Sequence, residues 1–573
     1  METGINRRTF ISSAAVLSVS LPVLAEAKAE PNWDEETDVV VVGSGAAGCV
    51  AAVTASAAGA QVVMCEKAGF LGGTTSKSGG AYWIPNNFDL KARGVPDHRE
   101  DFLRYVARYS YPAVYNPDHP TLGLPDRGYR LLEAYYDYSD EMIQHLQALG
   151  ALQSVPWMSY DGRSYFPDYQ DDLAENKTPR GRELGPGLAD GSIGSGNDLI
   201  AQLTGYLSRA SVQMRVDSPV VDLIQEADGE VKGVIVNTLS GPRSIYARRG
   251  VVFGSGGYSH NAELVHAYQP DPIFGRCALP TCTGDFIELA AKAGAQLGNM
   301  SAAWRVQCVF EQTLLYSSVP DEVWYPVGDS MFVVNKYGRR CFNERSNYHD
   351  RTRQTYLWDA NLAEYPNLLS FYIYDRRTAE RYAGYFPLPD NPLGEAYVIS
   401  GDTLEELAAA ISARLATLES HTGRVRLDAS FASTLRSTFN GFNEYAREGR
   451  DPDFERGSFP FDEAWQREEL PVSGNTWPDN PFPNRVLHPL SDIGPYFAII
   501  IGPAVLDTNG GPVTDENASV IDRNAKPIPG LYGAGNCVAS PAIHAYWGPG
   551  STIGSAMTFG YLAGRNAAAR KTS

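Results

Sequence analysis

Near the C-terminus, a phenol and a bare backbone amide lie four residues apart. They belong to Tyr546 and Gly550 in "HAYWGPGST" (544–552). Both groups are neutral hydrogen-bond donors. Two such donors, held away from water, stabilise the negative charge that develops on a ketone oxygen when the neighbouring carbon loses a proton. A tyrosine packed before a glycine-rich helix start explains the same residues, so this segment alone leaves both interpretations open.

A glycine-rich turn near the N-terminus predicts a phosphate site. The β-branched run at 39–42 indicates a fully buried strand. The turn that follows it has G-x-G-x-x-G spacing and consists of Gly43, Gly45 and Gly48. In such a turn the first glycine permits the sharp bend, the second lets a pyrophosphate approach the backbone, and the third allows close packing of helix on strand.

The residues after this turn complete a dinucleotide-binding unit. An alanine-rich helix is predicted over 46–58, and its first amides, those of Ala46 and Ala47, are expected to face the phosphates. A second strand over 62–64 leads to Glu66, which lies where a carboxylate accepts hydrogen bonds from a ribose diol. Because all these parts occur at the right spacing, we expect a bound dinucleotide.

Further glycine-rich stretches favour FAD over a nicotinamide. The stretch "GFLGGTTSKSGG" (69–80) can lay amides and hydroxyls along a second phosphate and a ribityl chain. Two later strand-and-glycine segments, "VVFGSGG" (251–257) and "GLYGAGN" (530–536), complete one site assembled from distant parts of the chain. The candidate cofactor contacts in these stretches are Gly73, Thr74, Thr75, Ser76, Gly79, Gly80, Gly256, Gly535 and Asn536.

A family resemblance follows from these blocks. The segment "GSGAAG…EK…GGTTSKSGG" resembles the fumarate reductase and 3-ketosteroid dehydrogenase superfamily of flavoproteins, and "GLYGAGN…HAYWGPGSTIGSAMTFGYLAG" is similar to the 3-ketosteroid Δ1-dehydrogenases. The resemblance covers nearly the whole chain after residue 35. It implies an α/β fold, in which a Rossmann-like FAD-binding domain built from discontinuous segments carries an inserted α+β catalytic domain, and it implies non-covalent FAD.

The activity implied by the resemblance is the introduction of a C1–C2 double bond into a 3-ketosteroid. The C1 hydride would pass to N5 of FAD, and Tyr546 and Gly550 would clamp the C3 oxygen. Thr552 and Ile553 would open a helix whose positive end faces the flavin pyrimidine and stabilises charge on the reduced ring. The remaining residues expected from the resemblance are Phe166, Trp547 and Pro549 at the substrate, and Lys67, Val220 and Asp285 at the cofactor.

The catalytic base is expected in "GRRCFNERSNYHDR" (338–351), where the resemblance points to Tyr348. A phenol with a pKa of about 10 is a poor base at neutral pH, so it needs a tyrosine partner, a proton exit or a lowered pKa. The family's Phe-Pro-Asp-Tyr element supplies such a partner in Tyr169, with Tyr160 and Tyr165 as close rivals. Two histidines, His349 and His544, flank the tyrosines, and we expect them to be hydrogen-bonded rather than catalytic.

Three other activities are open at this point. Within the steroid class, a Δ4-dehydrogenase acting on a 3-keto-5α-steroid is one alternative. A fumarate-reductase-like enoate reductase would need an arginine acid and cationic clamps, which the phenol-and-amide turn does not offer. A flavin-bound electron carrier without catalysis would not turn over any 3-ketosteroid.

The composition bounds the partners and the domains. The net charge of −19 over 573 residues argues against a nucleic-acid partner. No spacing of histidines, cysteines and acids suggests a metal site, and no disulfide or haem pattern is present. The FAD-binding domain is predicted over 35–308 and 490–573, and the catalytic domain over 309–489. Within the latter, a helix is expected over 403–419 and a long loop over 471–490.

The first thirty residues resemble an export signal. Arg7 and Arg8 precede a mildly apolar run and then a small-residue stretch with a candidate cleavage site at 25–27, which is typical of a twin-arginine leader. Segment 1–30 therefore predicts an exported, periplasmic protein; without export it would be cytoplasmic, with membrane association open. Besides the steroid, we expect a quinone or a dye-replaceable carrier as electron acceptor, allow a peripheral membrane contact, and leave the oligomeric state open.

Overall fold

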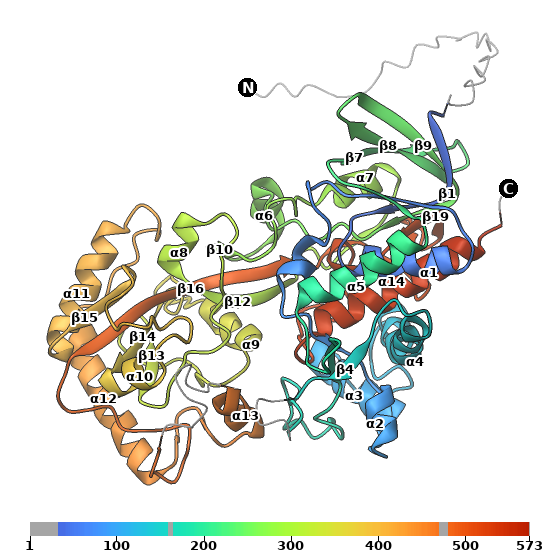
Figure 1. Ribbon diagram of the computed structural model, residues 1–573. Helices are drawn as coiled ribbons and strands as arrows, with labels where there is room; N and C mark the ends of the chain where they lie inside the picture. Colours follow the sequence, from blue (N-terminus) through green and yellow to red (C-terminus); the bar gives the residue numbers. More distant parts are fainter. Residues whose placement is uncertain (1–32, 159–163, 469–478, 572–573) are drawn as a thin grey trace, which may run out of the picture. The chain divides into compact units, whose positions relative to one another are not determined.

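The computed structural model describes residues 33–158, 164–468 and 479–571 (Figure 1). Residues from Asp34 onward form one compact unit. The predicted export segment, Tyr160 and part of the loop expected over 471–490 lie outside the described residues.

The first sheet contains the predicted dinucleotide-binding strands. Its eight strands are β1 (Glu35–Val42), β2 (Val62–Cys65), β6 (Gln213–Arg215), β7 (Val220–Gln225), β8 (Val231–Thr238), β9 (Gly241–Phe253), β18 (Ser519–Ile521) and β19 (Pro527–Gly533). The order is β18-β19-β9-β1-β2-β6, with β8 pairing β9 and β7 pairing β8. Strands β19, β9, β1, β2 and β6 run parallel. The strands predicted at 39–42, 62–64, 251–253 and 531–532 are thus confirmed, and they meet at the centre of one α/β sheet.

Small residues let two long helices approach each other beside this sheet. They are α1 (Ala46–Ala57), as predicted, and α14 (Ser551–Ala569). A Cβ atom on Gly560 would lie 2.4 Å from the carbonyl oxygen of Ala47, and one on Gly564 would lie 2.3 Å from that of Ala51. The glycines of "TFGYLAG" are therefore needed for close helix packing. Helix α5 (Gly196–Arg209) lies beside the same pair (Figure 1).

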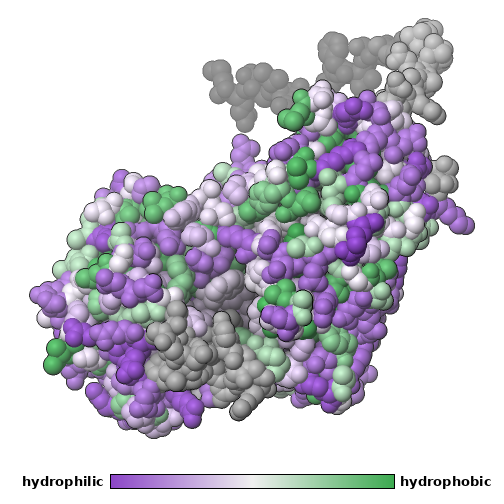
Figure 2. Space-filling view, in the orientation of Figure 1, coloured by the Kyte–Doolittle hydropathy of each residue, from purple (hydrophilic) through white to green (hydrophobic). Residues whose placement is uncertain are grey.

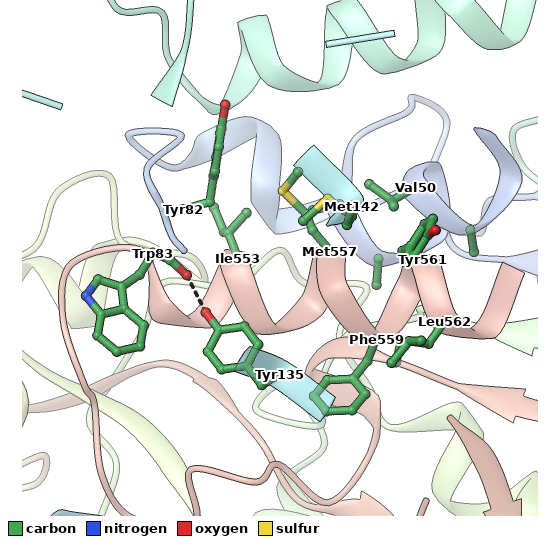
Figure 3. Packing of buried hydrophobic residues seen from close by; sticks show 14 of the residues in the cluster. Val50, Tyr82, Trp83, Tyr135, Met142, Ile553, Met557, Phe559, Tyr561 and Leu562 are labelled. Atoms are coloured by element: carbon green, nitrogen blue, oxygen red, sulfur yellow. Dashed lines mark hydrogen bonds between the residues drawn. The ribbon is translucent and has the colours of Figure 1, made fainter. Parts of the chain in front are cut away.

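A helical layer packs against α14 through apolar side chains. It contains α2 (Phe88–Ala92), α3 (Arg99–Ser110) and α4 (Asp126–Ala148), and next to it lies a small sheet of β3 (Tyr82–Trp83), β4 (Ser154–Pro156) and β5 (Glu183–Pro186). Figure 3 shows Met557 and Phe559 of α14 together with Met142 and Tyr135 of α4. It also shows the hydroxyl of Tyr135 donating to the Trp83 carbonyl. This bond fixes β3 against α4 at the start of α14.

A second, mainly antiparallel sheet fills the other half of the compact unit. Its strands are β10 (Gly275–Arg276), β12 (Ala303–Val309), β13 (Met331–Val334), β14 (Ser370–Asp375), β15 (Val398–Gly401) and β16 (Tyr496–Thr508). Helices α11 (Leu404–Thr417) and α12 (Phe431–Glu448) share an apolar core with these strands. Helix α11 confirms the prediction at 403–419, and Thr403 caps it.

The second sheet draws strands from both predicted domains. Strands β10, β12 and β16 lie mostly or wholly outside 309–489, yet β16 pairs with β14 and β15 from inside it. The predicted boundaries remain predictions. Movement of one predicted domain against the other at these boundaries would break the hydrogen bonds that join β16 to β14 and β15.

Short elements complete the chain. They are η1 (Gly73–Lys77), α6 (Ala262–Tyr268), α7 (Asp285–Lys292), β11 (Leu297–Gly298), α8 (Phe310–Leu315), α9 (Tyr348–Arg353), η2 (Gln354–Tyr356), α10 (Arg376–Arg381), α13 (Pro460–Glu468), β17 (Gly511–Pro512) and η3 (Gly535–Cys537). Polar and apolar residues are interleaved over the face shown in Figure 2. Among the described helices, none has the length and apolar character to cross a membrane, and the described residues contain no group of acids, histidines and cysteines that would hold a metal ion.

Candidate active site

One cavity of about 620 Å³ gathers nearly all the predicted site residues. It opens where the parallel strands of the first sheet end, which is where dinucleotide folds bind their ligands. The predicted cofactor residues that line it are Gly43, Gly45, Ala46, Ala47, Glu66, Lys67, Gly73, Thr74, Thr75, Gly79, Gly80, Val220, Gly256, Asp285, Gly535, Asn536, Thr552 and Ile553. Two predicted contacts do not line it: Gly48, and Ser76, whose hydroxyl donates to the Gly73 carbonyl at 2.8 Å.

The three glycines of the first turn have the geometry that their spacing predicts. Gly43 has a φ of +96°, and a Cβ there would lie 2.5 Å from the Gly254 carbonyl oxygen. On Gly48 a Cβ would lie 2.0 Å from the Gly43 oxygen, so this glycine permits helix packing. Gly45 is different, because its nearest protein atom would be Thr75 Oγ1 at 3.6 Å and the residue borders the cavity. A pyrophosphate therefore has room against Gly45 at the start of α1, where the Ala46 amide donates to Thr75 Oγ1 at 3.1 Å.

Acidic residues close the same end of the cavity. Glu66 is buried and accepts hydrogen bonds from the Ser44 amide at 2.9 Å, the Ser44 hydroxyl at 2.7 Å and the Ala68 amide at 2.8 Å. These bonds fix the carboxylate at the cavity wall, where a ribose diol would meet it. Lys67 pairs with Asp285 at 2.9 Å, which joins β2 to the start of α7.

Three tyrosines from three distant segments meet at the other end. The ring centroids of Tyr169 and Tyr546 lie 4.9 Å apart, those of Tyr169 and Tyr348 5.3 Å, and those of Tyr348 and Tyr546 5.6 Å. All three side chains are buried, and all three border the cavity. The structure thus brings the proposed base, its partner and the proposed oxyanion donor into one cluster.

Burial makes these phenols weaker acids. It raises the pKa of Tyr546 to about 12, against hydrogen bonding to Tyr348 and Thr552, which lowers it. Burial is also the main reason that the pKa values of Tyr169 and Tyr348 are raised well above their ordinary range. The neighbouring phenols of Tyr169 and Tyr546 add to the raised pKa of Tyr348. Of the three aids that a phenolic base needs, the structure supplies the tyrosine partner, and it does not supply a lowered pKa.

Gly550 also borders the cavity. Its φ is +82°, and a Cβ would lie 2.5 to 2.6 Å from backbone atoms of Ala81 and Tyr82. The Gly550 carbonyl accepts from the Trp83 amide at 3.1 Å. Within the described residues, no hydrogen-bond acceptor is recorded for the Gly550 N–H. Tyr546 and Gly550 therefore border the same cavity, and each carries a neutral hydrogen-bond donor.

Comparisons with known proteins agree with this geometry. The model of a family described as an FAD binding domain matches residues 38–553. A 3-oxosteroid 1-dehydrogenase from Mycolicibacterium smegmatis is 33% identical, over 93% of this chain and 98% of the relative. The chain belongs to the FAD-dependent 3-ketosteroid Δ1-dehydrogenase family. It is accordingly a flavin-dependent oxidoreductase with FAD as its cofactor, as predicted.

One solved structure and one further relative are also similar to this chain. A 3-ketosteroid Δ1-dehydrogenase from Sterolibacterium denitrificans, crystallised with 1,4-androstadiene-3,17-dione, aligns with a TM-score of 0.76 at 26% identity, covering 93% of this chain and 100% of that one. A 4-oxocyclohexanecarboxylate 2-dehydrogenase from Sinomonas cyclohexanicum is 31% identical, over 93% of this chain and 92% of the relative. The family fold therefore serves more than one cyclic ketone.

In this member of the 3-ketosteroid Δ1-dehydrogenase family, one aromatic residue lies elsewhere than predicted. Trp547 does not line the cavity: its side chain is fully buried, stacks on Tyr135 at 5.4 Å and donates to the Ser110 hydroxyl at 2.8 Å. Its carbonyl accepts the Tyr169 amide at 3.2 Å. Trp547 thus joins two tyrosine-bearing segments instead of contacting the cavity, whereas the predicted substrate residues Phe166 and Pro549 do border it.

Of the neighbouring residues Tyr165 and Tyr169, only Tyr169 borders the cavity. The guanidinium of Arg93 covers the ring of Tyr165 at 3.7 Å, and Tyr165 does not border the cavity. Tyr169 does, and buried charges support its segment: Asp168 pairs with Arg182, which also binds Asp97 at 2.7 Å. Tyr169 is therefore the member of the Phe-Pro-Asp-Tyr region that reaches the proposed base.

Several cavity residues escape sequence reasoning because no local motif marks them. Trp304 on β12 donates to Asn536 at 2.9 Å and lies 5.0 Å from the ring of Tyr546. Trp324 lies 4.7 Å from the ring of Tyr348. The others that bear on the chemistry are Asp507, Glu183 and Glu322. Trp304, Asp507 and Glu183 lie at the ends of β12, β16 and β5, three strands that the sequence did not predict.

A buried arginine holds the loops around the proposed base. Arg351, three residues after Tyr348, donates to Gln307 at 2.8 Å and to the Ser346 carbonyl at 2.6 Å. It also donates to the carbonyls of Val323 and Trp324 at 3.1 and 2.9 Å. Because one guanidinium spans all these groups, it ties helix α9 to the loop that carries Trp324.

Proposed function

We propose that this protein removes two hydrogens from adjacent ring carbons of a 3-ketosteroid and so creates a C1–C2 double bond. The observation that carries the proposal is the meeting of Tyr348, Tyr546 and Gly550 at the FAD cavity. Two neutral donors suit a ketone oxygen, and a second phenol, that of Tyr348, lies beside Tyr546 to receive a proton. The 3-oxosteroid dehydrogenases among the relatives support this choice of substrate.

In the proposed reaction, one group of residues holds the ketone oxygen and another removes the neighbouring proton. The ketone oxygen accepts hydrogen bonds from Tyr546 Oη and the Gly550 amide, which stabilises the charge that develops there as the C2–H bond breaks. Tyr348 Oη takes the C2 proton while its own hydroxyl proton passes to Tyr169 Oη, and Tyr169 in turn releases its hydroxyl proton toward solvent, because a neutral phenol cannot keep two protons. FAD, when bound, accepts the hydride from C1. The dry walls of the cavity strengthen the two hydrogen bonds to the ketone.

The charges around the cavity favour an uncharged substrate over a carboxylate. Glu183 and Glu322 both border the cavity and act electrostatically on Tyr546. Of the two lysines there, Lys67 pairs with Asp285, and Lys77 is bound by carbonyl groups, among them that of Cys277 at 3.1 Å. Among the described residues that line the cavity there is no arginine. A carboxylate substrate would therefore meet like charges, and the cation there that does not pair with Asp285, Lys77, donates its hydrogen bonds to carbonyl and hydroxyl groups of the protein.

A dye-coupled assay tests this choice. The substrates are a 3-oxo-Δ4-steroid, 4-oxocyclohexanecarboxylate and the methyl ester of the latter, which keeps the ring and removes the charge. We expect turnover of the steroid, slow turnover of the ester and least of the acid, with the product's new double bond placed at C1–C2 by NMR. Faster turnover of the acid than of its ester would contradict the proposal. A product unsaturated at C4–C5 from a 5α-steroid would assign the Δ4 reaction, and fumarate reduction the reductase reaction.

We further propose that the electrons leave to a quinone or a similar carrier, and that the protein is exported by a twin-arginine signal. The supporting feature for export is the Arg7-Arg8 pair before a small-residue stretch. Replacing both with lysine, as Arg7→Lys and Arg8→Lys, should leave the enzyme in the cytoplasmic fraction of the producing bacterium. Unchanged fractionation of that double variant would refute export by this route.

A further inference from the structure

A histidine joins the two segments that carry the proposed base and the proposed oxyanion donor. His349 directly follows Tyr348 in α9 and is 1% exposed. Its ring lies edge-on to Tyr546, with centroids 5.8 Å apart. It therefore contacts one tyrosine through space and the other through the chain.

Both ring nitrogens of His349 have backbone partners. Nδ1 lies 3.1 Å from the amide nitrogen of Arg305 on β12, and Nε2 lies 2.8 Å from the carbonyl oxygen of His544, two residues before Tyr546. An amide can only donate and a carbonyl can only accept, so Nδ1 accepts and Nε2 carries the proton. The partners thus fix the neutral tautomer, and burial, which lowers the pKa of His349 to about 4, agrees with it.

The bond from Nε2 is a direct link between α9 and the turn that holds Tyr546. A second link runs from Arg353 Nη1 to the same His544 carbonyl, but it is 3.4 Å long and exposed. The side chain of His544 is itself exposed, so the turn is held here through its backbone. Catalytic groups need placement within about 0.5 Å, and a misplacement of about 1 Å can lower the rate about 10²-fold.

We propose that His349 is a positioning residue that sets the separation of Tyr348 and Tyr546. His349 does not line the cavity, so it contacts neither the cofactor nor the ketone. It acts through its hydrogen bond to the His544 carbonyl and its ring contact with Tyr546. This inference rests on the roles proposed for the two tyrosines. The hydrogen bond from Nε2–H to the His544 carbonyl therefore matters more for the rate than the bond that Nδ1 accepts from the Arg305 amide.

Two amide variants separate the two bonds. Glutamine places its NH₂ near the position of histidine Nε2, so His349→Gln keeps a donor for the His544 carbonyl. Asparagine reaches only the position of Nδ1, so His349→Asn keeps an acceptor for Arg305 and loses the link to the turn. His488→Asn is the control: the ring of His488 likewise lies against a backbone carbonyl, that of Pro489 at 2.8 Å, but it is half-buried and contacts Phe482 rather than a tyrosine of the cavity.

The readouts are kcat and KM per bound flavin, the melting temperature of the holoenzyme, and deuterium exchange at C2 of the steroid. We expect His349→Asn to lower kcat and exchange about 10- to 100-fold with FAD retained, a smaller change in KM, and rescue to within a few-fold in His349→Gln. The control should match the wild type.

Equal losses in both His349 variants, losses that follow the melting temperature or flavin content, or failure of both to fold would overturn the proposal and assign His349 to stability alone. The roles of the tyrosines fail separately. If Tyr348→Phe and Tyr546→Phe keep full activity, the proposed function is wrong whatever His349 does. If they lose activity while His349→Asn does not, only the positioning role is wrong.

Discussion

Substituting Gly550 by alanine perturbs the proposed oxyanion site at one atom. The added Cβ would lie 2.5 Å from the carbonyl carbon of Ala81, 2.6 Å from its oxygen and 2.6 Å from the Tyr82 nitrogen. These are backbone atoms of a segment fixed to α14 by the Trp83–Gly550 hydrogen bond, so they cannot turn away as a side chain would. The φ of +82° adds strain for any residue with a Cβ.

The expected cost follows from these two terms. The left-handed conformation costs about 1–2 kcal/mol and the overpacking about 1–3 kcal/mol, so Gly550→Ala should lose about 2–5 kcal/mol of stability. Relief of the clash moves the Gly550 amide away from the ketone. Loss of one such donor should lower kcat about 10²- to 10³-fold.

Gly59→Ala is the matched control. Gly59 has a φ of +83°, nearly that of Gly550, but no atom lies within 4 Å of its added Cβ. It should therefore show only the conformational cost, about 1–2 kcal/mol, and normal kcat. The assay is melting of both holoenzymes at one FAD concentration, followed by steady-state kinetics per bound flavin. If Gly550→Ala melts like Gly59→Ala and keeps its kcat, the reasoning about the Gly550 amide is refuted.

Three further predictions concern the cofactor, the tyrosine partner and alkaline pH. Gly45→Ala has room against protein atoms, so the chain should fold but purify with little flavin absorbance, and a fully yellow protein would show that no phosphate meets Gly45. Tyr169→Phe should keep FAD and lower kcat less than Tyr348→Phe does, as measured by steady-state kinetics, because it removes only the proton's next acceptor. Since burial raises the pKa of Tyr546 from 10 to about 12, the unfolded chain loses this proton first, and the free energy of unfolding should fall between about pH 10 and 12 and be unaffected below. Denaturant titration should find this fall reduced in Tyr546→Phe.

Local patterns in the sequence were sufficient for the dinucleotide unit. The β-branched run of β1, the glycine spacing and the alanine-rich α1 follow from short-range steric rules, and the structure has them where they were predicted. The tyrosine cluster was found through family resemblance, because nothing in the local sequence distinguishes Tyr348 from the other 31 of the 32 tyrosines.

The remaining features depend on contacts between distant segments. The pairing of β16 with strands from inside the predicted catalytic domain has no local signal. Trp547 lies in a turn where an aromatic ring can face either way, and its contact with Tyr135 decides the direction. His349 acts through a carbonyl of residue 544, a partner that no pattern in the sequence indicates.

The central claim is that Tyr348 removes the proton next to a ketone held by Tyr546 and Gly550. The most direct measurement is exchange of the C2 proton of a 3-ketosteroid with heavy water, followed by NMR without an electron acceptor, in flavin-loaded wild type and Tyr348→Phe. The account predicts exchange in the wild type and a loss of about 10²- to 10⁴-fold in the variant, at equal flavin content. Exchange at the wild-type rate in Tyr348→Phe would contradict it and move the base to another residue, with Tyr169 the next to test.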